Sequence, residues 1–308
     1  MVDETKEQIR VCHFSDLHLP LSDRIRLNRL VGKRCLGYVN LRFLRGQKYK
    51  LAPFVTMLQE IAREQVDLVI MTGDLTSLAL DMEFEQAGRI LLDAGLQPEK
   101  TIIVPGNHDR YTFGADLSCA FEKGMERWLS PGFVRAQDYP IIQKVGPVVV
   151  AALDTAVWRN PIRSAGYIGP DQIERLVSAL DRDELRGCWP VIAMHHPPFR
   201  LRQARLRDFK DGLDGLEALL RALDHRRATI LHGHLHRLSR RHKAGLEVIG
   251  VPSASHDAGN ESGQMAYHIY TFGRGGLLHA EAVRHWPSGT NDKPLFERME
   301  LPEEAFAD

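Results

Sequence analysis

The sequence lacks long apolar runs and paired cysteines, and both absences limit what the chain can be. Its longest apolar stretch, residues 148–153, is far shorter than the ~20 residues of a transmembrane helix, so only a peripheral contact with a membrane stays open. The four cysteines form no C-x-x-C pair, as in a reduced intracellular protein and unlike a disulfide framework. They are Cys12, Cys35, Cys119 and Cys188. Residues 1–10 are too polar for a secretion signal, and we expect a cytoplasmic protein.

An excess of charge of either sign is also absent. Lys plus Arg and Asp plus Glu number 40 each, so the net charge favours neither nucleic acid nor a membrane as a partner. At 308 residues and 44% hydrophobic composition the chain can bury a large core. Because the composition does not shift sharply anywhere, we expect one large domain.

Short apolar runs alternate with helical patterns along the chain. The runs are rich in Val and Ile and have the length of buried strands, at residues 9–14, 66–71, 101–104, 145–153, 191–194, 228–231 and 246–251. Helices are expected to open at Pro53 and Pro170, and further apolar stripes at helical spacing lie within 84–94 and 216–223. Beyond Gly245, the runs 264–272 and 276–283 predict an antiparallel end without helices. These patterns predict an α/β domain with helices on the outer faces of a sheet core.

Polar clusters follow five of the apolar runs directly. They read Asp16-Leu17-His18, Gly73-Asp74, Gly106-Asn107-His108-Asp109, His195-His196-Pro197 and Gly233-His234-Leu235-His236. Side chains at strand ends gather in one crevice of an α/β sheet. In an extended segment residues i and i+2 point to one side, which would bring Asp16 and His18 to one centre. The three glycines before proposed ligands predict close backbone approaches.

The residue types in these clusters predict a pair of metal ions. Imidazoles with two carboxylates and one amide are softer than the all-oxygen shells of Ca²⁺ or Mg²⁺, so we expect Mn, Fe, Zn or Co. Asp74 has two oxygens, one for each ion, and such a bridge would hold the ions ~3.5–4 Å apart. Two divalent ions outweigh two carboxylates in charge, so the site would attract an anion, and a phosphate ester is the expected substrate.

The segments FSDLHL, TGDL, PGNHD, MHHPP and GHLH, in this order between about Val11 and His236, resemble the calcineurin-like metallophosphoesterase superfamily. The resemblance implies a layered β-sandwich core flanked by helices. It also implies one metal on Asp16, His18 and His236, a second on Asn107, His195 and His234, and Asp74 between them. By the same resemblance His108 would protonate the leaving alkoxide, Asp109 would orient the His108 ring, and a metal-bridging hydroxide would attack phosphorus in line.

Two further histidines are interpreted from their neighbours. His196 cannot easily face the same ion as His195, because adjacent extended side chains diverge, so we expect it to steady the loop by a hydrogen bond. His256 follows a strand-like run and could line the substrate entrance.

The connection over residues 19–52 is longer than strand-to-helix links usually are. Residues 24–50 carry nine basic and no acidic side chains, interleaved with apolar ones. Three interpretations stay open: a cationic loop packed on the domain, a lid that contacts anionic lipid headgroups or a lipid-linked phosphate, and a nucleic-acid contact. We divide the chain into a metallophosphoesterase domain over 1–287, with 19–52 as an insertion, and an acidic tail over 288–308.

The leading functional hypothesis is a metal-dependent phosphodiesterase, because the pattern resembles cyclic-nucleotide diesterases. A UDP-diacylglucosamine pyrophosphatase is the first alternative: His108 stands where the best-known of those enzymes resemble GNRD, while the basic connection favours a lipid-linked substrate. A DNA exonuclease would usually need additional elements that grip DNA. A scaffold without metals should have substituted ligands, and here every expected position is filled.

Overall fold

Two six-stranded sheets form the centre of the molecule. The computed structural model describes residues 6–19, 34–35, 38, 51–160, 162–201, 205–256, 264–286 and 295–302. Most of the predicted insertion over 19–52 and much of the predicted tail over 288–308 lie outside the described residues, so their roles stay predictions.

The first sheet has the strand order β14-β13-β12-β1-β2-β3. Its strands are β1 (Gln8–Phe14), β2 (Leu68–Met71), β3 (Thr101–Ile103), β12 (Ala266–Gly273), β13 (Gly276–His285) and β14 (Phe296–Glu300). The three strands β1, β2 and β3 are parallel, whereas β12, β13 and β14 join as an antiparallel run beside β1. The antiparallel end predicted from the sequence is therefore confirmed, and part of the predicted tail adds a strand to it.

The second sheet has the order β10-β11-β9-β7-β5-β4. Its strands are β4 (Ile141–Val145), β5 (Val148–Ala152), β7 (Trp189–Ala193), β9 (Ala228–His232), β10 (Ser239–Lys243) and β11 (Leu246–Gly250). Strands β11, β9, β7 and β5 are parallel. The run 145–153, predicted as one strand, turns at Gly146, whose φ is 53°, and forms the end of β4 and all of β5. A two-stranded sheet pairs β6 (Gly166–Tyr167) with β8 (Leu213–Asp214).

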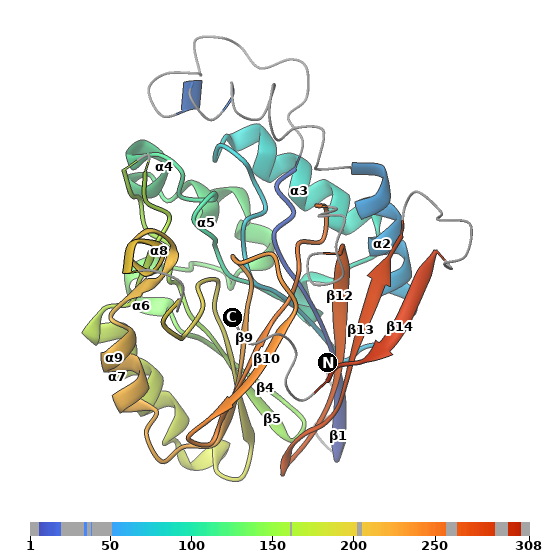
Figure 1. Ribbon diagram of the computed structural model, residues 1–308, viewed down its shortest axis with the longest axis vertical. Coiled ribbons are helices and arrows are strands. Elements are labelled where there is room, and N and C mark those ends of the chain that lie inside the picture. Colours follow the sequence, from blue (N-terminus) through green and yellow to red (C-terminus); the bar gives the residue numbers. More distant parts are fainter. Residues whose placement is uncertain are drawn as a thin grey trace.

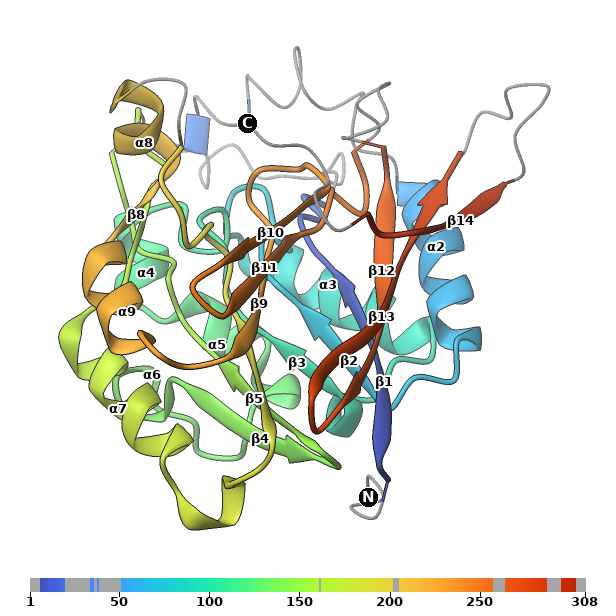
Figure 2. The same ribbon diagram turned by 60° about the horizontal axis from the view of Figure 1, so that its bottom comes forward.

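The helices cover the outer faces of the sandwich (Figures 1 and 2). They are α2 (Leu51–Arg63), α3 (Asp81–Asp93), α4 (Phe113–Leu117), α5 (Ala120–Gly124), α6 (Arg135–Asp138), α7 (Pro170–Leu180), α8 (Arg205–Asp211) and α9 (Leu216–Ala222). Among the described residues none of them is long and apolar enough to cross a membrane.

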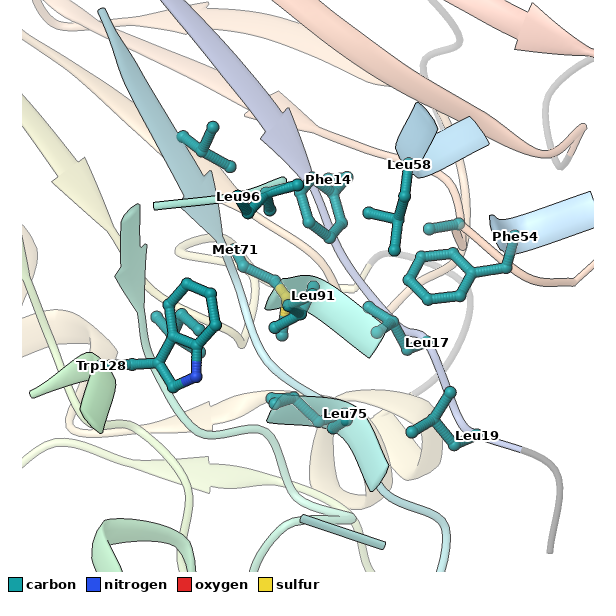
Figure 3. Packing of buried hydrophobic residues seen from close by; sticks show 14 of the residues in the cluster. Phe14, Leu17, Leu19, Phe54, Leu58, Met71, Leu75, Leu91, Leu96 and Trp128 are labelled. Atoms are coloured by element: carbon teal, nitrogen blue, oxygen red, sulfur yellow. The ribbon is translucent and has the colours of Figure 1, made fainter. Parts of the chain in front are cut away.

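Three apolar clusters hold these layers together. One fills the space between the sheets, where Val11 of β1 and Tyr270 of β12 face the side chains of β5, β7 and β9. A second packs the first sheet against α2, α3 and α5 and includes Phe54 and Phe84. Figure 3 shows part of this cluster, with Phe54 and Leu58 of α2 near Phe14. The third packs the second sheet against α7 and α9. The strands bury apolar side chains on both faces, so each sheet packs against the other sheet on one side and against helices on the other. This is the predicted α/β sandwich flanked by helices.

The two sheets meet at the end where their parallel strands terminate. Ser15, just after β1, forms an isolated parallel bridge with Ser253, just after β11. The Ala254 amide donates to the Ser15 carbonyl at 2.8 Å, and the Ser253 hydroxyl donates to the Asp16 carbonyl at 2.6 Å. This junction fixes the backbone at the first residue predicted to bind metal.

Candidate metal centre

The residues predicted as metal ligands all follow strands that end at this junction. Asp16 and His18 follow β1, Asp74 follows β2 and Asn107 follows β3, so the first sheet supplies four of them. The second sheet supplies the other three: His195 follows β7, and His234 and His236 follow β9. The structure brings all seven together, which is the arrangement expected at the carboxyl ends of parallel strands.

The backbone at five of these seven residues is left-handed, contrary to our expectation of extended segments. Asp16, His18, Asp74, His234 and His236 have φ between 40° and 67°. Such conformations are uncommon for residues other than glycine and gather at functional sites, where the surrounding structure enforces them. The side chains of Asp16 and His18 still point to one centre. They do so because the backbone turns at both residues, and not because side chains alternate along a strand. Leu17 between them is fully buried and points into the packing beside Phe54 (Figure 3).

The glycines before the ligands permit contacts that no side chain would allow, as predicted. A Cβ at Gly106 would lie 2.2 Å from Asp74 Oδ1, and one at Gly233 would lie 2.5 Å from Asp16 Oδ2. Gly73 has φ 94°, and a Cβ there would lie 2.5 Å from the Gly106 nitrogen. The loops after β2 and β3 therefore touch at Gly73 and Gly106, and the loop after β9 touches the loop after β1 at Gly233.

The ligand atoms form two groups. In the first, His236 Nε2 lies 3.1 Å from both Asp16 Oδ1 and His18 Nε2. In the second, Asn107 Oδ1 lies 3.1 Å from His195 Nε2 and 2.9 Å from His234 Nδ1. Metal–ligand bonds of about 2.1 Å place neighbouring ligands about 3.0 Å apart in an octahedron and about 3.4 Å apart in a tetrahedron. The spacing in both groups therefore fits a transition-metal ion.

Asp74 lies between the two groups and faces both with one oxygen. Its Oδ2 lies 3.5 Å from His18 Nε2 and 3.5 Å from His195 Nε2. Its Oδ1 instead accepts a hydrogen bond from the His108 amide at 2.7 Å. The expectation of one oxygen for each ion stays a prediction; in the structure Oδ2 faces both groups, while the loop after β3 contacts Oδ1.

The charges of the site also suit cations. Burial alone would raise the pKa of Asp16 and Asp74, but the neighbouring imidazoles, chiefly His236 and His195 respectively, hold the pKa of both carboxyls below the ordinary range. Burial lowers the pKa of His234 to about 3. Burial would also lower the pKa of His195, but the Asp74 carboxylate raises it to about 9. Two buried carboxylates that stay ionised beside imidazole nitrogens form a donor set for divalent metals.

His108 and Asp109 lie at the site, but their relationship differs from the expected one. The His108 ring packs edge-on against the His18 ring, with the ring centroids 4.7 Å apart. Its Nδ1 lies 2.9 Å from the Ser77 carbonyl oxygen. The Asp109 carboxylate accepts hydrogen bonds from the Gly106 and Thr76 amides, each at 2.9 Å. The expected role of Asp109 in orienting the His108 ring is therefore not supported. Asp109 ties the loop after β2 to the loop after β3, and Ser77 orients the ring.

The hydrogen bonding predicted for His196 is present, and its non-ligand role stays a prediction. One of its ring nitrogens comes within 4.8 Å of the donor atoms of His195 and His234. Both nitrogens are nevertheless occupied, since Nδ1 lies 2.9 Å from Thr155 Oγ1 and Nε2 lies 2.9 Å from the Ser164 carbonyl. His196 thus fixes the loop that holds Ser164 beside the metal centre.

Replacing His196 by alanine should leave the metal content of the purified protein unchanged. It should lower the free energy of unfolding by about 2–4 kcal/mol, because the buried partners lose hydrogen bonds and a cavity opens. Elemental analysis and thermal unfolding measure the two effects, with His195→Ala as the comparison that loses metal. If the His196→Ala variant lost as much metal as the His195→Ala variant, His196 would be a metal ligand.

Several residues that support the ligands have no signal of their own in the sequence. The Thr72 carbonyl lies 2.6 Å from His195 Nδ1, and the Ser255 hydroxyl donates to the Leu17 carbonyl. His256 lies beside the centre, with its ring centroid 5.9 Å from that of His236, and its place at a substrate entrance stays a prediction. The contacts of Thr72 and Ser255 involve backbone carbonyls, which any residue type offers, so the sequence pattern could not find them.

This fold, with histidine and carboxylate ligands gathered at the junction of two sheets, is that of a metal-dependent phosphoesterase. A family model described as calcineurin-like phosphoesterase matches residues 9–238, and the chain belongs to that family. The family uses divalent metal ions, which agrees with the donor set described above.

A curated relative and two solved structures are similar to this chain. The relative is a probable cyclic nucleotide phosphodiesterase of Synechococcus sp. (strain WH7803), 26% identical over 66% of this chain and 73% of its own length. A purple acid phosphatase from yellow lupin shares 12% identity with a TM-score of 0.61 over 95% of this chain, which spans about half (53%) of that phosphatase. A dimetal phosphatase from Danio rerio shares 14% identity with a TM-score of 0.59, over 96% of this chain and 99% of its own. These structures confirm the fold.

Proposed function

We propose that the protein is a phosphodiesterase that uses two divalent metal ions. The observation that carries this proposal is Asp74 Oδ2, which lies at the same 3.5 Å distance from a ligand in each of the two groups. The first ion would be held by Asp16, His18 and His236, the second by Asn107, His195 and His234, with Asp74 shared. Mn, Fe, Zn and Co all suit these donors. Such a metal pair, when bound, polarises a phosphoryl oxygen and lowers the pKa of water.

The diester preference rests on the relative whose name is probable cyclic nucleotide phosphodiesterase. A cyclic nucleotide and other diesters of phosphate carry a single negative charge at phosphorus. The charge left over by two divalent ions and two carboxylates would attract phosphate esters of either kind, so the preference for diesters rests on the relative alone. We further propose that the enzyme acts in the cytoplasm.

We assign His108 the role of proton donor to the leaving group. A carbonyl oxygen only accepts, so the hydrogen bond to Ser77 keeps a proton on Nδ1. Nε2 is therefore the atom that exchanges a proton with substrate. A ring nitrogen of His108 lies within 4.8 Å of the ligand atoms of His18 and Asp74, and this proximity supports the assignment.

Replacing His108 by asparagine should slow the hydrolysis of diesters to an extent that depends on the leaving group. We expect kcat to fall by about 10²–10⁴-fold for an alkyl leaving group, which needs a proton, and much less for p-nitrophenolate, which leaves as a stable anion. Steady-state rates on a series of diesters test this. His225→Asn, which changes an exposed histidine, is the control. Equal losses across the series would contradict proton donation by His108.

A second substrate class, a lipid-linked phosphate, is favoured by one observation. Six of the ten large apolar side chains that stand exposed among the described residues lie on α4, α8 and the loop between β5 and β6. They are Phe113, Leu117, Trp158, Ile162, Leu206 and Phe209. Ser164 of the same loop bonds to His196, next to a proposed ligand, so the apolar surface is tied to the site. An acyl chain would fit such a surface.

A substrate panel with Mn²⁺ tests the function. Turnover of bis-p-nitrophenyl phosphate and cyclic AMP above that of p-nitrophenyl phosphate is the expected result. Turnover of UDP-diacylglucosamine above all three would establish the lipid-linked class instead. A protein that binds Mn²⁺ but turns over none of them would refute the proposal of diester hydrolysis.

A further inference from the structure

A chain of hydrogen bonds runs through the core behind the metal centre, and neither the sequence motifs nor the proposed function uses it. His268 Nδ1 lies 2.9 Å from the Tyr270 hydroxyl, which lies 3.2 Å from His13 Nδ1. His13 Nε2 lies 2.9 Å from Thr72 Oγ1. We call these four residues the His13 chain. All four are fully buried.

The His13 chain crosses three neighbouring strands of the first sheet. His13 on β1 stands opposite His268 on β12 in the strand register, and Thr72 comes directly after β2. Tyr270 belongs to the apolar cluster between the two sheets. Polar side chains among apolar ones cost free energy unless they are paired, so the position of this network in the core calls for a reason beyond packing.

The hydrogen bonds of the network have one consistent assignment of donors and acceptors. Burial holds the pKa of His13 and His268 below the ordinary value, so each ring is neutral and has one N–H. Among the described residues His268 Nε2 has no hydrogen-bond partner, and a buried N–H without an acceptor is rare. The proton of His268 therefore sits on Nδ1 and is donated to the Tyr270 oxygen. Tyr270 then donates to His13 Nδ1, and His13 Nε2–H donates to Thr72 Oγ1.

Thr72 is the point at which this network reaches the ligands. Its carbonyl accepts a hydrogen bond from His195 Nδ1 at 2.6 Å, which leaves His195 Nε2 directed at Asn107 and Asp74. Thr72 also immediately precedes Gly73 and Asp74 in the chain. A shift of the Thr72 side chain would therefore move one proposed ligand of the second ion and the ligand shared by both.

We propose that the His13 chain is a positioning network that sets the metal affinity of the centre through Thr72. His13 and Tyr270 are not among the proposed ligands; they hold the Thr72 side chain through its hydroxyl, and this contact would fix the Thr72 carbonyl that orients His195 and the backbone that leads to Asp74. This inference rests on the proposed metal centre. Partners that orient metal-binding histidines typically contribute 10–100-fold to metal affinity.

Metal binding, measured apart from activity, tests this network. Metal-stripped protein is titrated with Mn²⁺ by calorimetry, and the visible spectrum of the Co²⁺ form reports the ligand geometry. We expect Thr72→Val, which keeps the shape and the carbonyl of Thr72, and His13→Leu to weaken binding of the second ion by about 10–100-fold. His13→Gln can donate to Thr72 and accept from Tyr270, so it should restore most of the affinity.

Tyr139→Phe is the matched control. Tyr139 is a fully buried tyrosine of the same inter-sheet cluster, and its hydroxyl has no hydrogen-bond partner among the described residues. The Tyr139→Phe substitution should leave the affinity for Mn²⁺ unchanged, while Tyr270→Phe should weaken that affinity. The proposal is overturned if Thr72→Val and His13→Leu fold and bind Mn²⁺ like the unaltered protein, or if Tyr139→Phe weakens binding as much. Unaltered protein that binds no metal would instead refute the metal centre itself.

Discussion

Turnover of bis-p-nitrophenyl phosphate should fall by about a thousandfold or more when Asp74 is replaced by asparagine. The reason is the position of Oδ2, 3.5 Å from a ligand of each group, where a neutral amide cannot bind two cations as a carboxylate does. Metal ions contribute several kcal/mol to the stabilisation of a phosphoryl transition state, and about 4 kcal/mol corresponds to a thousandfold in rate. Steady-state rates at saturating Mn²⁺ measure the effect.

The control for Asp74 is Asp93→Asn, which neutralises an exposed carboxylate at the end of α3. It should leave both the rate and the metal content unchanged. An Asp74→Asn protein that folds, binds two ions and keeps the rate of the unaltered enzyme would contradict the shared role of this carboxylate.

A large loss of stability is also expected from Gly106→Ala. The added Cβ would lie 2.2 Å from Asp74 Oδ1 and 2.3 Å from the Asp74 backbone nitrogen, so backbone as well as side chain must move. Because the loops after β2 and β3 are held together here, no rotamer change relieves the overlap. We expect the free energy of unfolding to fall by about 3 kcal/mol, together with loss of activity. Denaturant titration followed by circular dichroism measures the first effect.

Gly114→Ala provides the comparison for this substitution. Gly114 lies in α4 with nothing within 4 Å of an added Cβ. Alanine is a better helix former than glycine, so this variant should be as stable as the unaltered protein or slightly more so. If Gly106→Ala matches it in stability, the loops are not packed as closely as described.

The sheet architecture was largely predictable from the sequence because buried strands have a strong composition signal. The runs that become β1, β2 and β9 are rich in apolar residues, and each ends two or three residues before a proposed ligand. The helix predicted to open at Pro53 begins two residues earlier, at Leu51, with the proline still in the first turn. The run 145–153 was misread, since Gly146 and Pro147 form a turn inside an otherwise continuous apolar stretch, and the strands β10 and β14 were not predicted.

The identities of the clustered residues were predictable, but their individual contacts were not. Left-handed backbone at Asp16 and His236 depends on neighbouring loops that are distant in sequence. Likewise, Asp109 bonds to backbone amides and His108 to a backbone carbonyl, and neither contact leaves a trace in residue type. Motif order identifies which side chains meet; tertiary packing decides which atom of each one faces the centre.

Each proposed ion has ligands from both halves of the sandwich. The first would be held by Asp16 and His18 from one sheet and His236 from the other, and the second by Asn107 from one sheet and His195 and His234 from the other. Neither half alone offers more than two of the three unshared ligands of either ion. Metal can therefore bind only after the two halves have associated during refolding. The delay between the recovery of secondary structure and the uptake of Co²⁺ would measure the time that this association takes.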